Sequence, residues 1–247
     1  MLTDRRKFVA WLAWSLCLVC VGLALCTLLL YLLNGRILVG FFRERDGAVM
    51  VLVICFSVVG ALIVSHRPEN PIGWIFCAAA LFQALSAVGV EYGTYALVTR
   101  PGSLPLGAFM SWLVEWIWAA GLGLILVFLP LLFPNGRPPS RRWWPVAWLG
   151  GLSIGLISGS VSLLVCLLEG RGTADDPPGW LLALLQAGFP LMLLAALLAV
   201  IALYLRFLRT RGTSGSRSSD SPPPPPRRSP GYFFSSSYSA PGAGCSK

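Results

Sequence analysis

Apolar residues along the chain gather into six long runs that alternate with short polar segments. The runs cover about residues 8–33, 48–64, 72–90, 106–132, 145–168 and 180–205, and a short loop is expected at residues 34–46. After the third run, residues 91–95 lead to residues 100–105, whose prolines and glycine are expected to end the helix and mark an exposed loop. A helix needs about 20 apolar residues to cross a hydrocarbon core roughly 30 Å thick, and the runs are close to or beyond that length. The pattern predicts an all-α integral membrane bundle of six transmembrane helices over residues 1–211, surrounded by the lipid bilayer.

The overall composition agrees with a membrane protein. Hydrophobic residues make up 56% of the 247 residues and charged residues 12%, and the mean hydropathy is +0.73. The net charge of +9 would suggest a nucleic-acid partner in a soluble protein. Here the basic residues lie at the ends of the apolar runs and near the C-terminus, where they set topology and contact anionic lipid. We therefore expect no nucleic-acid partner.

The basic residues also predict the orientation of the chain. If the N-terminus is cytoplasmic, six spans place 14 lysines and arginines on the inner side and five on the outer side. The excess of positive charge belongs on the cytoplasmic side. We expect a multi-pass protein of the cell membrane with both termini in the cytoplasm.

The composition changes after Arg211. Ser, Pro and Gly account for 23 of the last 36 residues, including the run from Pro222 to Pro226. Such a segment has too few apolar residues to fold, so residues 212–247 are predicted to form a disordered tail. GC-rich DNA read in the wrong frame gives this composition, and sequencing beyond the Arg211 codon would test the hypothesis that the frame is lost there.

Two short polar segments carry prolines in a pattern that ends one helix and begins the next. Residues 66–74 read HRPENPIGW, and residues 132–142 read LFPNGRPPSRR. Proline disfavours the helical conformation of the residue before it, so the chain leaves its helix at both segments. Asn70 is placed to cap the following helix, with Pro71 at the first helical position. A tight turn between two helices is the simplest interpretation of each segment.

Glu115 is the only acidic residue inside a predicted span, and three tryptophans lie close to it in the sequence. A charged group at the centre of a bilayer costs about 2.5–3.5 kcal/mol, so such residues are functional candidates. Glu115 lies about nine residues from the start of its run, roughly 14 Å along a helix. Two interpretations stay open: an intramembrane sensing residue, or a side chain that reaches the headgroups beside an interfacial tryptophan belt.

Gly151, Gly155 and Gly159 recur at four-residue spacing in the fifth run. Small residues at this spacing give a smooth face on which another helix can approach closely. We expect this face to pack against a helix of the same chain rather than to form a dimer seam.

The chain offers little of the chemistry that an enzyme or a metal site needs. Six of the seven cysteines lie in the apolar runs, and the pair Cys17 and Cys20 has no second pair or histidine cluster to complete a metal site. The single histidine and the lack of paired carboxylates in the runs leave no template for acid–base catalysis. We expect no metal, no cofactor, no catalytic residues and no enzymatic activity of this chain.

Both proline-containing turns, together with YGTYAL at residues 92–97 and PGSLP at residues 101–105, resemble the multi-span N-terminal region of actinobacterial-type sensor histidine kinases. The resemblance covers about residues 5–211. It implies a membrane input module that biases a cytoplasmic kinase domain, with a kinase or a second copy of the chain as partner. The candidate signalling residues that it implies are Arg67, Asn70, Pro71, Gly73, Trp74, Pro134, Asn135, Gly136 and Arg137.

This chain departs from the family pattern because it lacks the features of a kinase catalytic region. It has no phosphoacceptor-type helix and no glycine-rich ATP lid, and His66 lies in a turn. We therefore expect a sensory or signal-input module without a catalytic domain. The alternative is a small stand-alone membrane protein of transporter-like function, although the spans supply few polar residues besides Glu115.

Overall fold

The computed structural model describes residues 2–43, 45–134, 136–137, 140–171 and 178–214. These residues form α-helices, short 3₁₀- and π-helices and turns, with no strand among them. The helices are α1 (Leu2–Leu33), α2 (Leu38–Arg43), α3 (Arg45–His66), α4 (Pro71–Thr94), π-helix η1 (Tyr95–Thr99), α5 (Gly107–Gly123), π-helix η2 (Leu124–Phe128), α6 (Leu129–Leu132), 3₁₀-helix η3 (Arg141–Trp143), α7 (Trp144–Arg171) and α8 (Gly179–Ser214).

Six helical segments are long and apolar enough to cross a membrane, which confirms the predicted fold class. They are Arg5–Leu33, Asp46–His66, Pro71–Thr99, Gly107–Leu132, Arg141–Leu167 and Gly179–Leu208. Many large apolar side chains face outward, for example Trp11 at 66% and Leu193 at 62% exposed. Outward apolar side chains on every span are what a lipid environment requires. The chain is a multi-pass membrane protein.

The chain forms two compact units, Met1–Arg209 and Thr210–Lys247. The first unit holds the six candidate spans. In the second unit the described residues end with α8 at Ser214. The predicted disordered tail therefore lies almost entirely outside the described residues.

The third span is longer than predicted. The apolar run ends near residue 90, but α4 continues to Thr94 and η1 carries the helix on to Thr99. Glu91 thus lies within a spanning helix, and the prediction that Glu115 is the only acidic residue inside a span is wrong. The expected loop at residues 34–46 is also partly helical, because α2 occupies Leu38–Arg43.

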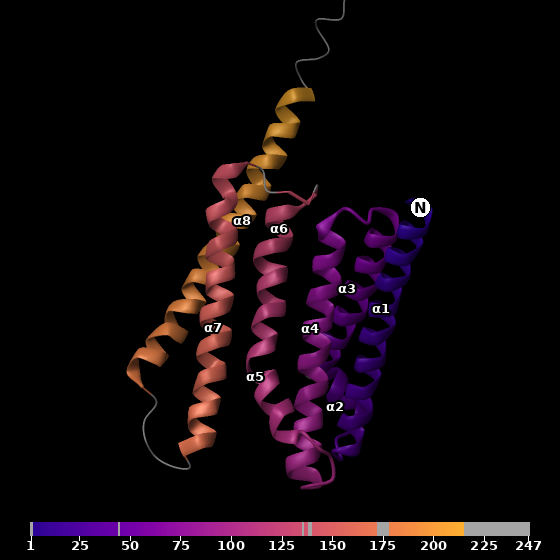
Figure 1. Ribbon diagram of the computed structural model, residues 1–247, viewed down its shortest axis with the longest axis vertical. Helices are drawn as coiled ribbons and strands as arrows, with labels where there is room; N and C mark the ends of the chain where they lie inside the picture. Colours follow the sequence, from indigo (N-terminus) through magenta and orange to yellow (C-terminus); the bar gives the residue numbers. More distant parts are fainter. Residues whose placement is uncertain (1, 44, 135, 138–139, 172–177, 215–247) are drawn as a thin grey trace, which may run out of the picture. The chain divides into compact units, whose positions relative to one another are not determined.

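Within the first unit, α4 packs against α1, α3 and α5, and α5 packs against α7 (Figure 1). Small residues make these contacts close. A methyl group on Gly60 would overlap Cys77 of α4, and one on Gly89 would overlap Val114 of α5. Helices in a membrane gain little from apolar burial against each other, so close packing of small residues is what holds them together.

The start and end of each span define two ends of the bundle. The N-terminal end carries the start of α1, the turn from α3 to α4, and the end of α6 (Figure 1). The opposite end carries the end of α1, α2, and the loop from η1 to α5. Each end holds one of the polar arrangements described below.

Candidate functional site

The first proline-containing turn caps α4 as predicted. The amide of Ile72 donates to Oδ1 of Asn70 at 3.1 Å, and Pro71 occupies the first turn of the helix. The amide of Asn70 in turn donates to the carbonyl of Arg67 at 3.0 Å. Two further candidate residues serve the same turn: Gly73 lies directly against Val64 of α3, and Nε1 of Trp74 donates to the Pro68 carbonyl at 3.4 Å.

The second turn lies directly against the first. Nδ2 of Asn70 is 3.5 Å from the carbonyl oxygen of Pro134. Gly136 is buried and has φ of +71°, and a methyl group in its place would overlap both Pro71 and Asn70. A glycine is required here both for the positive φ and for the close approach. Two segments about 65 residues apart thus form one structure, which we call the turn junction and define as residues 66–71, 133, 134, 136 and 137.

Helix α8 is bonded to the turn junction. Nη1 of Arg206 donates to the carbonyl of Phe133 at 2.9 Å and to the carbonyl of Arg137 at 3.2 Å. The junction therefore joins α3 and α4 on one side to α6 and α8 on the other. Of the predicted signalling residues, only Asn135 lies outside the described part of the chain.

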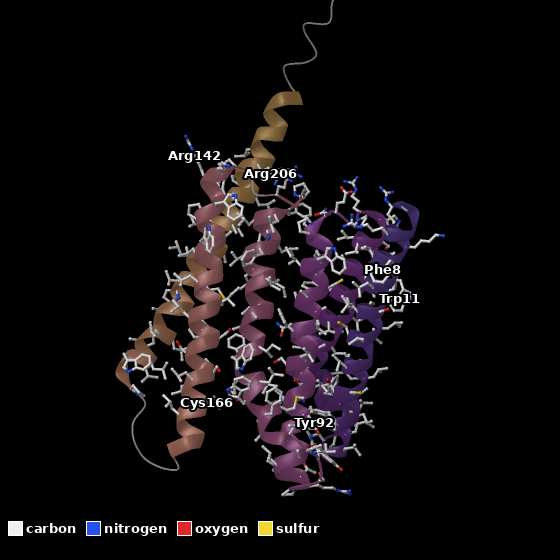
Figure 2. All side chains as sticks on the ribbon, in the orientation of Figure 1. Phe8, Trp11, Tyr92, Arg142, Cys166 and Arg206 are labelled. Atoms are coloured by element: carbon white, nitrogen blue, oxygen red, sulfur yellow. The ribbon has the colours of Figure 1, made fainter. Side chains whose placement is uncertain are left out.

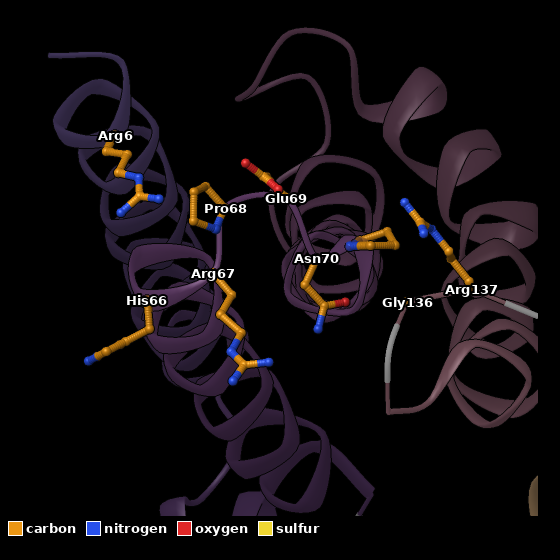
Figure 3. A pocket seen from close by; sticks show the side chains of 9 residues that line it. Arg6, His66, Arg67, Pro68, Glu69, Asn70, Gly136 and Arg137 are labelled. Carbon is orange, nitrogen blue, oxygen red and sulfur yellow. The ribbon is translucent and has the colours of Figure 1, made fainter. Parts of the chain in front are cut away.

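A pocket of about 420 Å³ opens on the turn junction (Figure 3). Its walls combine the start of α1, the end of α3, the first turn and the second turn. The charged or titratable residues that line it are Arg6, His66, Arg67, Glu69 and Arg137. The excess of arginine over glutamate gives this pocket a net positive charge.

The opposite end of the bundle holds an ion pair between a buried glutamate and a partly exposed arginine, which the sequence did not predict. Glu91 is only 2% exposed, and its Oε1 accepts from Nη1 of Arg36 at 3.0 Å. Nδ2 of Asn34 donates to Oε2 at 2.7 Å and to the Glu91 carbonyl at 3.2 Å. Oγ1 of Thr99 then donates to Oδ1 of Asn34 at 2.6 Å. We call Asn34, Arg36, Glu91 and Thr99 the Glu91 clamp.

The charged groups of the Glu91 clamp have several interaction partners each. Both carboxylate oxygens of Glu91 accept a hydrogen bond, and the guanidinium of Arg36 lies 5.2 Å from the centre of the Tyr31 ring. An ion pair withdrawn from water needs such additional bonds to compensate for lost hydration. The clamp ties the end of α1 and the residues after it to α4 and η1. Nearby, Oη of Tyr92 donates to the Pro105 carbonyl at 2.6 Å and holds the next loop (Figure 2).

Glu115 has a different environment from Glu91. It is exposed and lines a groove of about 390 Å³ with Asp46, Gln83 and Ser86. In the described part of the chain neither Asp46 nor Glu115 forms an ion pair. The structure therefore places Glu115 in an amphipathic groove between α3, α4 and α5, and both interpretations of its role stay open.

The glycines of α7 do not pack within the described chain. A methyl group on Gly151, Gly155 or Gly159 would meet no atom within 4 Å, and all three residues are exposed. The prediction of packing within the chain is therefore wrong for this face. The buried face of α7 instead carries Ser153 and Ile157, and Gly150 lies against Val127 of η2. The sequence alone could not distinguish these faces, because both carry small residues at helical spacing.

Comparisons with protein-family models, with curated proteins and with solved structures gave no match for this chain. The two polar arrangements of the bundle, the turn junction and the Glu91 clamp, are therefore the basis on which its function can be inferred.

Proposed function

We propose that the chain is a membrane-embedded sensory or signal-input module of the cell membrane, with both termini in the cytoplasm. The turn junction is its output site, and a kinase or a second copy of the chain receives the signal. The observation that carries this proposal is the bonding of Arg206 to Phe133 and Arg137, because it connects α8 to the contact between the two turns.

The junction suits transmission because its contacts are few and specific. One long hydrogen bond from Asn70 and the close approach of Gly136 join the first turn to the second. Small shifts at such an interface produce discrete rearrangements, because packed contacts do not deform continuously. A shift of α4 relative to α6 would therefore move residues 133, 134, 136 and 137, and with them the bonded arginine of α8.

The proposal can be tested by fusing the first unit, residues 1–209, to the catalytic region of a sensor kinase and measuring autophosphorylation. Gly136→Ala is expected to change phosphorylation at an unchanged protein level in the membrane, because the added methyl group separates the two turns. Gly102→Ala is the matched control, since Gly102 also has a positive φ but faces open space. Equal phosphorylation in the fusion and both variants would contradict the proposal.

A second candidate function is transport, and the groove at Glu115 favours it. Carboxylates and amides inside a membrane mark ion or substrate paths in many transporters. Purified protein in proteoliposomes would then conduct a cation, and Glu115→Gln would abolish the flux. The absence of any flux above that of empty liposomes, tested with sodium, potassium and protons, would reject transport of these ions.

A further inference from the structure

The pocket at the turn junction is lined by three arginines that pair with no acidic residue of the described part of the chain. Arg6, Arg67 and Arg137 line it, and none of them forms an ion pair or a side-chain hydrogen bond with a described residue. All three are exposed. In Figure 3 they come from three different segments and lie around Asn70 and Pro68. A site with unpaired guanidinium groups on several sides is suited to a multivalent oxyanion.

We propose that this pocket binds the phosphate group of an anionic phospholipid headgroup. Guanidinium groups present planar pairs of donors that match the oxygens of phosphate, which makes arginine the preferred residue for such recognition. The chemistry recognised is an anionic phosphate, which a soluble phosphate ester also carries. This inference rests on the proposed function, because the phosphate would be a ligand of the turn junction that we propose as the output site.

The walls of the pocket are held in place by hydrogen bonds and close contacts within the turn junction. Asn70 is fixed by its bonds to Ile72 and Arg67, and the buried Gly136 lies against the start of α4. Helix α4, which has 24 residues, begins at this pocket with Pro71. The positive end of its helix dipole adds to the attraction for an anion.

The position of the pocket favours a lipid over a soluble anion. Arg6 lies on α1 two residues before Phe8 and five before Trp11. The rings of Phe8 and Trp11 are 63% and 66% exposed and stack with their centres 6.5 Å apart. Figure 2 shows both rings on the outer side of α1 near the N-terminal end. Exposed aromatic rings next to basic residues mark the level of the headgroups in membrane proteins. The pocket therefore lies where lipid phosphates are concentrated.

Glu69 provides an internal check on this assignment. It is exposed, lines the same pocket, and is the one negatively charged side chain among the described residues that line it. A carboxylate near a bound phosphate repels it, so removing this charge must strengthen binding if the site holds an anion. An ordinary surface arginine cluster would give the same opposite signs, so a control arginine outside the pocket must show whether the effects are specific to it.

The test uses the full-length protein in an uncharged detergent, with native mass spectrometry to count bound lipid. Dioleoyl phosphatidylglycerol and dioleoyl phosphatidylcholine are titrated separately. The wild type is expected to bind phosphatidylglycerol about tenfold more tightly than phosphatidylcholine. Arg67→Gln and Arg137→Gln are each expected to weaken the binding of phosphatidylglycerol about fivefold. Glu69→Gln is expected to strengthen it about twofold to fivefold. Arg142→Gln is the matched control, because Arg142 is exposed at the same end of the bundle and does not line the pocket.

Each outcome decides a different point. Equal affinity for the two lipids, or an equal loss for Arg142→Gln and Arg67→Gln, would overturn the proposal. Competition by millimolar glycerol 3-phosphate would support the phosphate site and identify a soluble ester as a ligand, whereas its failure to compete would support the lipid. Selective lipid binding without any effect of Gly136→Ala on the kinase fusion would leave this inference standing and reject the proposed function. Equal binding of the two lipids, together with a changed phosphorylation of the Gly136→Ala fusion, would reject this inference and leave the proposed function standing.

Discussion

The charged residues at the two ends of the bundle differ in their burial and in their hydrogen bonding. At one end Glu91 is buried and accepts hydrogen bonds from Asn34 and Arg36. At the other end Arg6, Arg67 and Arg137 are exposed around an open pocket, and their guanidinium groups form no ion pair or hydrogen bond with a described residue. Both ends join segments that are distant in the sequence, and charged side chains take part at each: the Glu91 clamp bonds to a buried carboxylate, whereas the bonds from Arg206 at the turn junction go to backbone carbonyls and are exposed.

This difference suggests a division of roles along the helices. Buried and fully satisfied polar networks rigidify a structure, whereas exposed segments with few contacts open at low free-energy cost. We infer that the Glu91 clamp fixes α1, α4 and η1 relative to each other. The turn junction then keeps the freedom to respond to a ligand or a partner.

The largest expected loss of stability follows from removing the guanidinium group of Arg36 from the Glu91 clamp. Arg36→Met leaves the Glu91 carboxylate buried with one charge-assisted bond fewer, and we expect it to lower the free energy of unfolding by about 3 kcal/mol. The side chain of Arg36 is 41% exposed, so the effect lies at the lower end of the range for buried pairs. Unfolding in mixed detergent micelles measures it.

Two further variants make that result specific to the ion pair. Arg43→Met removes an exposed arginine of α2 at the same end and is expected to change stability by less than about 0.5 kcal/mol. The double variant Arg36→Met with Glu91→Gln should recover part of the loss, because no buried charge is left unpaired. If Arg36→Met is as stable as the wild type, the Glu91 clamp does not stabilise this end.

Gly136→Ala tests the close contact at the turn junction. We expect a loss of about 2 kcal/mol, because alanine is strained at φ of +71° and its methyl group would overlap Pro71 and Asn70. Gly102→Ala isolates the first of these causes, since Gly102 has φ of +79° in open space, and should cost about 1 kcal/mol. Equal losses in the two variants would show that the contact between the turns adds nothing.

Asn70→Ala removes the cap of α4 and is expected to cost about 1 kcal/mol. Asn70→Asp keeps an oxygen that accepts from the Ile72 amide, so it should restore most of the stability. It cannot donate to the Pro134 carbonyl, and it adds a negative charge near the arginines of the pocket. Thermal unfolding of both variants separates the contribution of the cap from that of the contact between Asn70 and Pro134. If Asn70→Asp is as unstable as Asn70→Ala, the cap does not contribute to stability.

The smallest expected effect concerns Glu115. Because this residue is exposed in its groove and has no described ion pair, Glu115→Gln should change stability by less than about 0.5 kcal/mol. Glu91→Gln should be clearly less stable than Glu115→Gln, since it weakens the bonds from Arg36 and Asn34. A similar stability of the two variants, measured by thermal unfolding, would remove the distinction between a buried and an exposed acidic residue.

Much of the architecture followed from the sequence. Hydropathy located all six spans, and the pattern of Asn70 followed by Pro71 predicted the cap of α4 that the structure shows. These features depend on neighbouring residues, and local composition is therefore sufficient to predict them. The contact of the two turns was not predictable in this way, because Gly136 and Pro71 are 65 residues apart.

The Glu91 clamp was missed for a related reason. Glu91, Tyr92 and Thr94 interrupt the apolar run, so hydropathy ended the span near residue 90. The helix breakers Pro101 and Gly102 lie about ten residues further on, and they were the better signal for its end. The partners Asn34 and Arg36 lie 57 and 55 residues away, a separation at which no local pattern predicts pairing.

Hydrogen exchange measured by mass spectrometry on the full chain in phosphatidylcholine nanodiscs would test the central claim most directly. The amides to compare are those of residues 66, 67, 69, 70, 133, 136 and 137 at the turn junction and those of residues 34–36 and 91–99 at the Glu91 clamp. We expect faster exchange at the junction, and slower exchange there alone when phosphatidylglycerol is included. Faster exchange at the clamp, or an equal response of both ends to the anionic lipid, would contradict the account.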